Sequence, residues 1–427
     1  MTWSLSSVLS SASSFNPLSS IFTGFPSRTG SSVLDSSSVP WAASSLMSST
    51  PLLAVPALFL AILGGGIFGS SMYEATGSSE SPLSSRAGNV DETFPDADAK
   101  PATLKSVTHI EHDMYEVVVY SHAMRREVKN EVILPGGPGN AERRPTFYLL
   151  MGADGAANGW SWRNSSKHQE FFQDKLVNVV TPIGSVSSMQ ADWYEDDKET
   201  GRNKWLTYFT KELPPLMDAH FYGNGRDAIG GISLSGGPAL HIASLEPARF
   251  RAAASYSGCP ATSGFLGNIY VSEGLKMNGA DKVKMWGRFG DPAWVAHSPV
   301  LHLDDFKDIA LFVSAAEGVP GAIDATATSS ERIGPPVAIE AASYACSTYF
   351  VEKAREAGVD VEWYGQVEGT HSWGLFELSM RKSWDVIGPA LDVKPFTRDT
   401  PVVVDLKPSE APQPVGGKGS SGSSRQH

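Results

Sequence analysis

A serine between small residues is the strongest chemical feature of this sequence. Residues 227–240 read DAIGGISLSGGPAL, so a short apolar run passes through Gly and Ser into a second apolar stretch. This pattern is typical of a nucleophile elbow, a strained turn between a strand and a helix. The turn tolerates only small residues two positions before and after the serine, and it holds the serine hydroxyl beside free N–H groups. In one register, Ser233 lies between Gly231 and Ser235. In the other, Ser235 lies between Ser233 and Gly237. A Gly/Ser turn without chemistry is the alternative.

One histidine has the position that a general base needs beside such a serine. In folds built around a nucleophile elbow, the base follows the serine in the chain and lies on a loop after a late strand. Among the histidines between Ser233 and residue 395, only His371 lies between a predicted late strand and a closing helix, in the segment EGTHSWG. His371 is therefore the candidate base, with an ordinary polar loop residue as the alternative.

The acid partner of His371 is not decided by the residues alone. The usual acid position is the loop after the predicted strand 309–313, which offers Glu317 and Asp324. Glu340, at the start of the next predicted helix, is a third candidate. Hydrophobic periodicity does not separate the three carboxylates.

Short apolar runs alternate with helical patterns in the part of the chain that must position these residues. The predicted strands lie at 114–120, 127–134, 146–150, 176–181, 228–232, 251–255, 309–313 and 359–364. The predicted helices lie at 204–221, 236–245, 337–357 and from 373 onward. This alternation predicts an α/β fold with a mostly parallel central sheet and helices on both faces.

The N-terminal region differs in composition from the rest of the chain. Residues 1–50 are Ser-rich and carry only Arg28 and Asp35 as charges, and the run at about 52–68 is apolar and uncharged. A run of this length is typical of an export signal or a membrane anchor. We therefore expect the protein to be exported to the cell envelope, either membrane-anchored or secreted.

The remaining composition predicts how the chain is divided. Residues 1–75 form the Ser-rich region with the export segment, 76–102 a polar linker, 103–395 the folded domain, and 396–427 a C-terminal tail disordered at its end. The 427-residue chain has a formal net charge of -12 and lacks basic tracts. This composition argues against nucleic acid as a partner.

The two cysteines, Cys259 and Cys346, predict one disulfide, because a lone pair in an exported protein is more often oxidised than free. No His/Cys grouping has the spacing of a metal site. We therefore predict neither a metal nor a cofactor.

Further segments resemble the mycolyltransferases of the antigen 85 complex and their corynebacterial relatives, a family of α/β-hydrolases. In chain order they are Asp192-Trp-Tyr194, Lys204-Trp205, Glu212-Leu-Pro214, Gly231 to Gly236, Met285-Trp-Gly287, Asp291-Pro-Ala-Trp294 and Gly369-Thr-His-Ser-Trp373. Each match is weak alone, but the ordered set over residues 145–390 is specific to the family. The resemblance implies the α/β-hydrolase fold.

The resemblance also assigns the catalytic residues. It implies Ser233 as nucleophile, His371 as base and Glu340 as acid, with the backbone N–H groups of Leu234 and Ala153 as the oxyanion hole. Under this assignment, replacing either of the other two candidate acids is expected to cost little activity.

The activity implied is transfer of a mycolyl group through an acyl-serine intermediate. The implied donor is trehalose monomycolate, and the acceptor is trehalose monomycolate, arabinogalactan or another envelope hydroxyl. Trp373 is the candidate for stacking on a sugar or lining an acyl channel, and Ser372 and Asp154 are further candidate substrate-binding residues. The chain departs from the family at Met151, where the antigen 85 proteins carry a sugar-binding aspartate.

Two other functions remain open. The first is an exported carboxylesterase or thioesterase that uses water as acceptor. The second is a non-catalytic envelope-binding protein on a hydrolase scaffold.

Overall fold

The computed structural model describes residues 89–325 and 334–397. The predicted export segment at about 52–68 and the end of the C-terminal tail lie outside these residues. Within the described ranges, no helix combines the length and the apolar character that crossing a bilayer requires.

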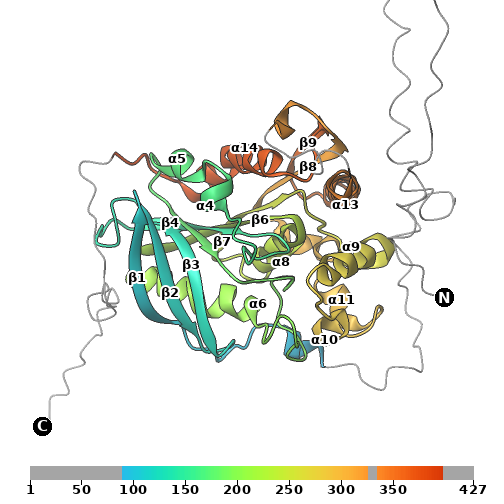
Figure 1. The fold of residues 1–427 in the computed structure, drawn as a ribbon, viewed down its shortest axis with the longest axis horizontal. Helices are drawn as coiled ribbons and strands as arrows, with labels where there is room; N and C mark the ends of the chain where they lie inside the picture. Colours follow the sequence, from blue (N-terminus) through green and yellow to red (C-terminus); the bar gives the residue numbers. More distant parts are fainter. Residues whose placement is uncertain (1–88, 326–333, 398–427) are drawn as a thin grey trace, which may run out of the picture. The chain divides into compact units, whose positions relative to one another are not determined.

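A nine-stranded sheet forms the centre of the described residues (Figure 1). Its strands are β1 (Thr103–Glu111), β2 (Met114–Ser121), β3 (Arg126–Ile133), β4 (Arg144–Leu150), β5 (Asn178–Pro182), β6 (Gly223–Ile232), β7 (Phe250–Tyr256), β8 (Ala310–Val319) and β9 (Val361–Glu368). Their order in the sheet is β1-β2-β3-β5-β4-β6-β7-β8-β9. The pairs β1–β2, β2–β3 and β3–β5 are antiparallel. The pairs β5–β4, β4–β6, β6–β7, β7–β8 and β8–β9 are parallel. The predicted α/β architecture is confirmed.

Strand β4 shows why the sequence folds this way. All seven of its residues are buried, as expected for a parallel strand that is covered on both faces. Successive side chains point to opposite faces of a strand. Phe147 and Leu149 therefore join one hydrophobic cluster, whereas Tyr148 and Leu150 join the other.

Helices cover both faces of the sheet. The helical segments are η1 (Val90–Thr93), α4 (Trp162–Ser165), α5 (His168–Phe172), α6 (Trp205–Thr207), η2 (Tyr208–Glu212), α7 (Leu213–His220), η3 (Ser233–Ser235), α8 (Gly236–Leu245), α9 (Gly264–Lys276), α10 (Lys282–Trp286), α11 (Pro292–Ala296), η4 (Pro299–Leu301), η5 (Leu303–Phe306), η6 (Ala322–Asp324), α13 (Pro335–Glu356) and α14 (Trp373–Leu391). Residues of α6, α7, α8 and α13 form one core with the sheet, and residues of α4, α5 and α14 form the other. Figure 1 shows α5 and α14 on the side of the sheet opposite α6 and α8.

A third, smaller cluster lies where β6 passes into α8. Leu234 packs there with Val271 and Leu275 of α9 and with Trp286 and Trp294 from the segments that follow. Both tryptophans are core residues, because each is at most 2% exposed. Helix α9 therefore borders the residue that follows Ser233.

The described part of the predicted linker makes specific contacts with the domain. Thr93 is buried, and its hydroxyl hydrogen-bonds His297 Nε2 at 2.8 Å. Phe94 stacks on the same imidazole at 5.0 Å. Residues 93 and 94 are thus held against the segment that contains α11.

Candidate active site

Ser233 lies in a strained turn between β6 and α8. Its φ is 54°, in the left-handed region that non-glycine residues rarely adopt. A Cβ added to Gly231 would lie 2.3 Å from the carbonyl oxygen of Ser235. The turn therefore requires glycine two residues before Ser233, as expected for a nucleophile elbow.

The two serines of the elbow have different partners. The Ser233 hydroxyl lies 2.8 Å from His371 Nε2. Ser235 is 2% exposed, donates to the carbonyl oxygen of Met151 at 2.5 Å and accepts from Gln190 Nε2 at 2.8 Å. Ser235 thus joins the elbow to the end of β4, and Ser233 is the serine beside the imidazole.

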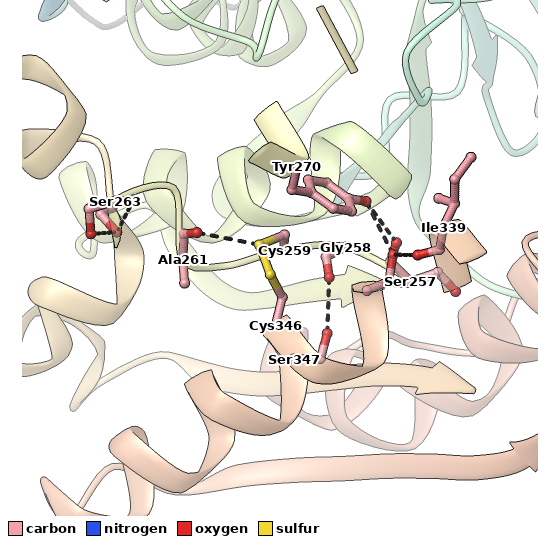
Figure 2. Close-up of a disulfide and its surroundings, with 11 residues drawn as sticks. Ser257, Gly258, Cys259, Ala261, Ser263, Tyr270, Ile339, Cys346 and Ser347 are labelled. Carbon is pink, nitrogen blue, oxygen red and sulfur yellow. Dashed lines mark hydrogen bonds between the residues drawn. A yellow bond between two sulfur atoms is a disulfide. The ribbon is translucent and has the colours of Figure 1, made fainter. Parts of the chain in front are cut away.

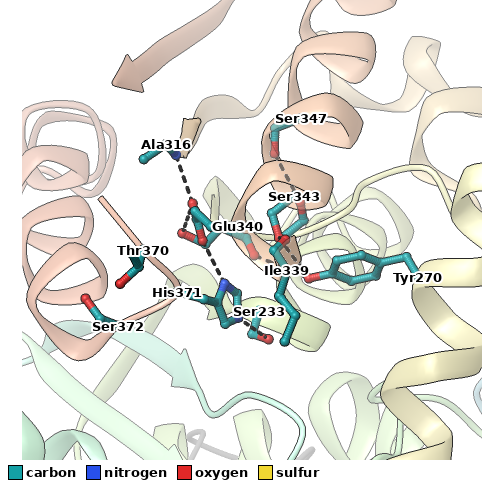
Figure 3. A network of polar contacts seen from close by, with 12 residues as sticks. Ser233, Tyr270, Ala316, Ile339, Glu340, Ser343, Ser347, Thr370, His371 and Ser372 are labelled. Carbon is teal, nitrogen blue, oxygen red and sulfur yellow. Dashed lines mark hydrogen bonds and ion pairs between the residues drawn. The ribbon is translucent and has the colours of Figure 1, made fainter. Parts of the chain in front are cut away.

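His371 connects Ser233 to a buried carboxylate (Figure 3). Its Nδ1 lies 2.7 Å from Glu340 Oε2, and the Glu340 side chain is 0% exposed. The other oxygen, Oε1, accepts from the Ser257 hydroxyl and from the Ala316 N–H, each at 2.8 Å. With Nδ1 protonated, the imidazole donates to Glu340 and leaves Nε2 free to accept the Ser233 proton.

The other two candidate acids lie elsewhere. Glu317 is half-buried in β8, where its charge adds to the effect of burial in raising the pKa of Tyr344. Asp324 is 0% exposed and accepts hydrogen bonds from Thr370 and Ser372. Among the three carboxylates, Glu340 is the one bonded to the His371 ring.

The two predicted oxyanion-hole peptides both lie beside Ser233. Leu234 follows it directly and is the second residue of η3. A Cβ built on Gly152 would lie 3.2 Å from Ser233 Cβ, so the Gly152–Ala153 peptide passes close to Ser233. The carbonyl oxygen of Gly152, which belongs to this peptide, accepts from the Gly155 N–H at 3.1 Å.

The three candidate substrate-binding residues have different surroundings. Asp154 is half-buried and accepts from Asn158 Nδ2 at 2.6 Å. Trp373 is half-buried at the start of α14, and its ring meets the Trp162 ring edge-on at 5.4 Å. The Ser372 hydroxyl is instead buried and donates to Asp324 at 2.8 Å. We therefore assign Ser372 to the architecture of the loop rather than to substrate.

A disulfide joins Cys259 to Cys346 (Figure 2). Cys259 follows β7, and Cys346 lies on α13, the helix that carries Glu340. The Ser347 hydroxyl adds a hydrogen bond to the carbonyl oxygen of Gly258 at 3.1 Å. Both links attach the acid-bearing helix to the segment after β7.

Two contributors to the site were missed by the sequence argument. Ser257, with a φ of 49°, turns its hydroxyl to Glu340 and accepts a hydrogen bond from the Tyr270 hydroxyl at its carbonyl oxygen. Burial raises the pKa of Tyr270 to about 12, so it remains a neutral donor. These contacts cross three elements, and no local pattern in the sequence indicates them. Within the described ranges, no group of three His, Cys, Asp or Glu residues is placed to hold a metal ion.

The profile of the Esterase family matches residues 121–383, more than half of the chain. Ag85B of Mycobacterium leprae, a diacylglycerol acyltransferase/mycolyltransferase, is 30% identical over 60% of this chain and 77% of its own length. The chain belongs to the Esterase family, with the antigen 85 mycolyltransferases among its relatives.

Other comparisons agree with this membership. Ag85C of Mycobacterium avium, also a diacylglycerol acyltransferase/mycolyltransferase, is 34% identical over 47% of this chain. That match spans 57% of the relative's length. The crystal structure of Mycobacterium tuberculosis MPT51 (FbpC1) superposes with a TM-score of 0.53 at 23% identity, covering 64% of this chain and 96% of the other. The α/β-hydrolase fold and the family resemblance seen in the sequence are confirmed.

Proposed function

We propose that this chain is an exported serine acyltransferase of the cell envelope. The observation that carries the proposal is the continuous chain of hydrogen bonds from Ser233 through His371 to Glu340. This is the geometry of a nucleophile activated by a base that a buried carboxylate holds in one tautomer. Export rests on the apolar run at about 52–68, and a disulfide fits an oxidising compartment.

The reaction is a double displacement. Ser233 Oγ attacks the carbonyl carbon of an acyl ester while its proton passes to His371 Nε2. The ester C–O bond then breaks, and the leaving alcohol takes that proton. A second alcohol gives its own proton to Nε2 and attacks the carbonyl carbon of the acyl-serine. The bond between that carbon and Ser233 Oγ then breaks, and Oγ takes the proton from Nε2.

The remaining residues stabilise the charges that develop. The N–H groups of Leu234 and Ala153 donate to the oxyanion of each tetrahedral intermediate. Glu340 holds the Nδ1 proton and stabilises the imidazolium while Nε2 carries the serine proton. Trp373 and Asp154 are the proposed contacts to the sugar or acyl chain.

The proposed donor is trehalose monomycolate, and the proposed acceptor is trehalose monomycolate or another envelope hydroxyl. The relatives are named diacylglycerol acyltransferase/mycolyltransferase, and these names support an acyl or mycolyl group as the group transferred. The acceptor site differs from that of the antigen 85 proteins, because Met151 is 3% exposed within the hydrophobic core and supplies no carboxylate there.

Radiolabelled trehalose monomycolate tests the proposal. The protein is incubated with the donor, with and without added trehalose, and Ser233→Ala is the control. A disaccharide diester formed by the wild type alone supports acyl transfer. Free fatty acid as the sole product supports the second candidate, a hydrolase, which the Esterase family match favours. Absence of turnover together with failure of a fluorophosphonate probe to label the wild type would support the non-catalytic alternative.

A further inference from the structure

Asp324 lies at the acid position usual for this fold, after β8, but it contacts the loop of the base instead of its ring. It ends η6 and is 0% exposed. Its Oδ1 accepts from the Thr370 N–H at 3.1 Å, the Thr370 hydroxyl at 2.9 Å and the Ser372 hydroxyl at 2.8 Å. Its Oδ2 accepts from the Gly321 N–H at 3.0 Å.

These donors lie on both sides of His371. Thr370 precedes the base and Ser372 follows it (Figure 3). The Asp324 oxygen Oδ1 accepts from both of these neighbours of the imidazole. The backbone adds two further restraints. The Gly369 N–H donates to the carbonyl oxygen of Val319 at 2.7 Å, and the His371 N–H donates to that of Pro336 at 3.3 Å.

The contacts require an ionised carboxylate. Burial alone would raise the pKa of Asp324, but the hydrogen bonds from Gly321, Thr370 and Ser372 outweigh burial and hold the pKa below its usual range. An asparagine in the same place has one NH₂ group, which donates and cannot accept. That group would face either the Gly321 N–H or the donors from the base loop. Neither orientation accepts every donor that the aspartate accepts.

We propose that Asp324 is a positioning residue that fixes the His371 loop, so that the imidazole reaches Ser233 and Glu340 together. The site thus divides two tasks between two carboxylates: Glu340 bonds the ring and Asp324 bonds the loop. This inference rests on the proposed function for its kinetic consequence, but not for its structural one.

The kinetic consequence is a loss of turnover without a matching loss of binding. A misplacement of a catalytic group by about 1 Å can cost on the order of 100-fold in rate. We expect Asp324→Asn to lower kcat on a short-chain nitrophenyl ester by about 10–100-fold while KM changes little. Glu317→Gln, on the same strand–loop segment but half-buried, is the matched control and should retain activity.

A spectroscopic signature separates this inference from the activity itself. An imidazole Nδ1 proton that is bonded to a carboxylate gives a proton resonance far downfield, and His371→Gln identifies the signal by removing it. We expect the wild type and Glu317→Gln to show the signal, and Asp324→Asn and Asp324→Ala to weaken or shift it. Thr370→Val is a less disruptive substitution, because it removes only one donor to Asp324. Its downfield signal is measured if the Asp324 variants fold poorly.

A double-mutant cycle adds the second criterion. The kcat loss of Thr370→Val should largely disappear in the Asp324→Ala background, because the hydroxyl acts through the carboxylate. An unchanged downfield signal in the Asp324 variants, or full additivity in the cycle, would overturn the inference. A wild type that shows the signal but turns over no ester would instead contradict the proposed function, while signal loss in the variants would still support the positioning role.

Discussion

Ser233 and Ser235 lie two residues apart, but their hydroxyls belong to different networks: Ser233 to the imidazole of His371, Ser235 to the end of β4. The pattern in the sequence allowed either serine to be the nucleophile. The hydrogen bonds now give each serine a separate expected phenotype.

Ser233→Ala should abolish acyl transfer and leave the fold intact, because the substitution removes one half-buried hydroxyl. Losses of this kind in serine hydrolases reach roughly 10⁴–10⁶-fold in turnover. Ser235→Ala should keep turnover per folded molecule but lower the free energy of unfolding by about 1–3 kcal/mol, since Gln190 loses a buried partner. Ester turnover and urea unfolding measure the two effects. The reverse ranking of activities would place the nucleophile at Ser235.

Glu340→Gln should lower kcat by about 10³–10⁴-fold, because the amide no longer enforces the tautomer in which Nδ1 donates. Glu317→Gln should lie within about twofold of the wild type. The sequence argument expected Asp324→Asn to be equally mild. The hydrogen bonds from Thr370 and Ser372 lead us to expect a larger loss for Asp324→Asn instead. Steady-state kinetics of the three variants test the ranking, and a Glu317→Gln defect as large as that of Glu340→Gln would contradict it.

Reducing the disulfide should impair activity before it unfolds the domain. Its loop of 87 residues corresponds to about 4–5 kcal/mol in the chain-entropy model, an upper figure. More directly, the bond attaches α13, and with it Glu340, to the segment after β7. Activity and circular dichroism are followed together in increasing dithiothreitol, with Cys346→Ala under non-reducing conditions as the comparison. Coincident loss of both signals would show that the disulfide stabilises only the fold.

Acid should destabilise the domain through its buried neutral histidines. Burial lowers the pKa of His168 and of His241 to about 3, and lowers that of His297 as well. Such groups contribute stability above their unfolded pKa near 6.5, and the contribution falls as pH drops toward the folded pKa. Each adds about 1.4 kcal/mol per pH unit to the slope in that window.

The free energy of unfolding measured at pH values from 7.5 to 4.5 tests this slope. His168→Gln should make the slope shallower by about the contribution of one group. Exposed His122 offers the matched control, since His122→Gln removes a histidine that is solvated in the folded chain. Equal slopes in the wild type and His168→Gln would contradict the prediction.

The sequence predicted the elements whose periodicity reflects burial. Every predicted strand from 114–120 to 359–364 corresponds to a strand of the structure. The clearest apolar runs are those of inner strands such as β4 and β5, which are buried throughout because the sheet is covered on both faces. Strand β1 was missed, since only one of its nine residues, Val107, is buried and it has no apolar run. Helices α9, α10 and α11 were also missed. Most of their buried apolar residues pack in the small cluster around Leu234.

The sequence predicts those parts of the site that depend on residues close together in the chain. The elbow depends on small neighbours of Ser233, which the sequence displays. The choice among Glu317, Asp324 and Glu340 depends on how β8, α13 and the base loop meet, and no periodicity encodes that arrangement. The family resemblance favoured Glu340, and the hydrogen bond to His371 agrees with that choice.

Strand β9 is the last strand in the described sheet and is paired with β8 along one side. Val367, near its end, is 59% exposed, and the chain enters the loop of the base immediately afterwards. Edge segments with few buried contacts open at lower free-energy cost than inner strands. Fraying of this edge would remove one of the supports of the base loop while the inner strands stay paired. The working lifetime of the enzyme would then be set by sub-global opening at β9, and hydrogen exchange in residues 361–368 would report on it more faithfully than the melting temperature.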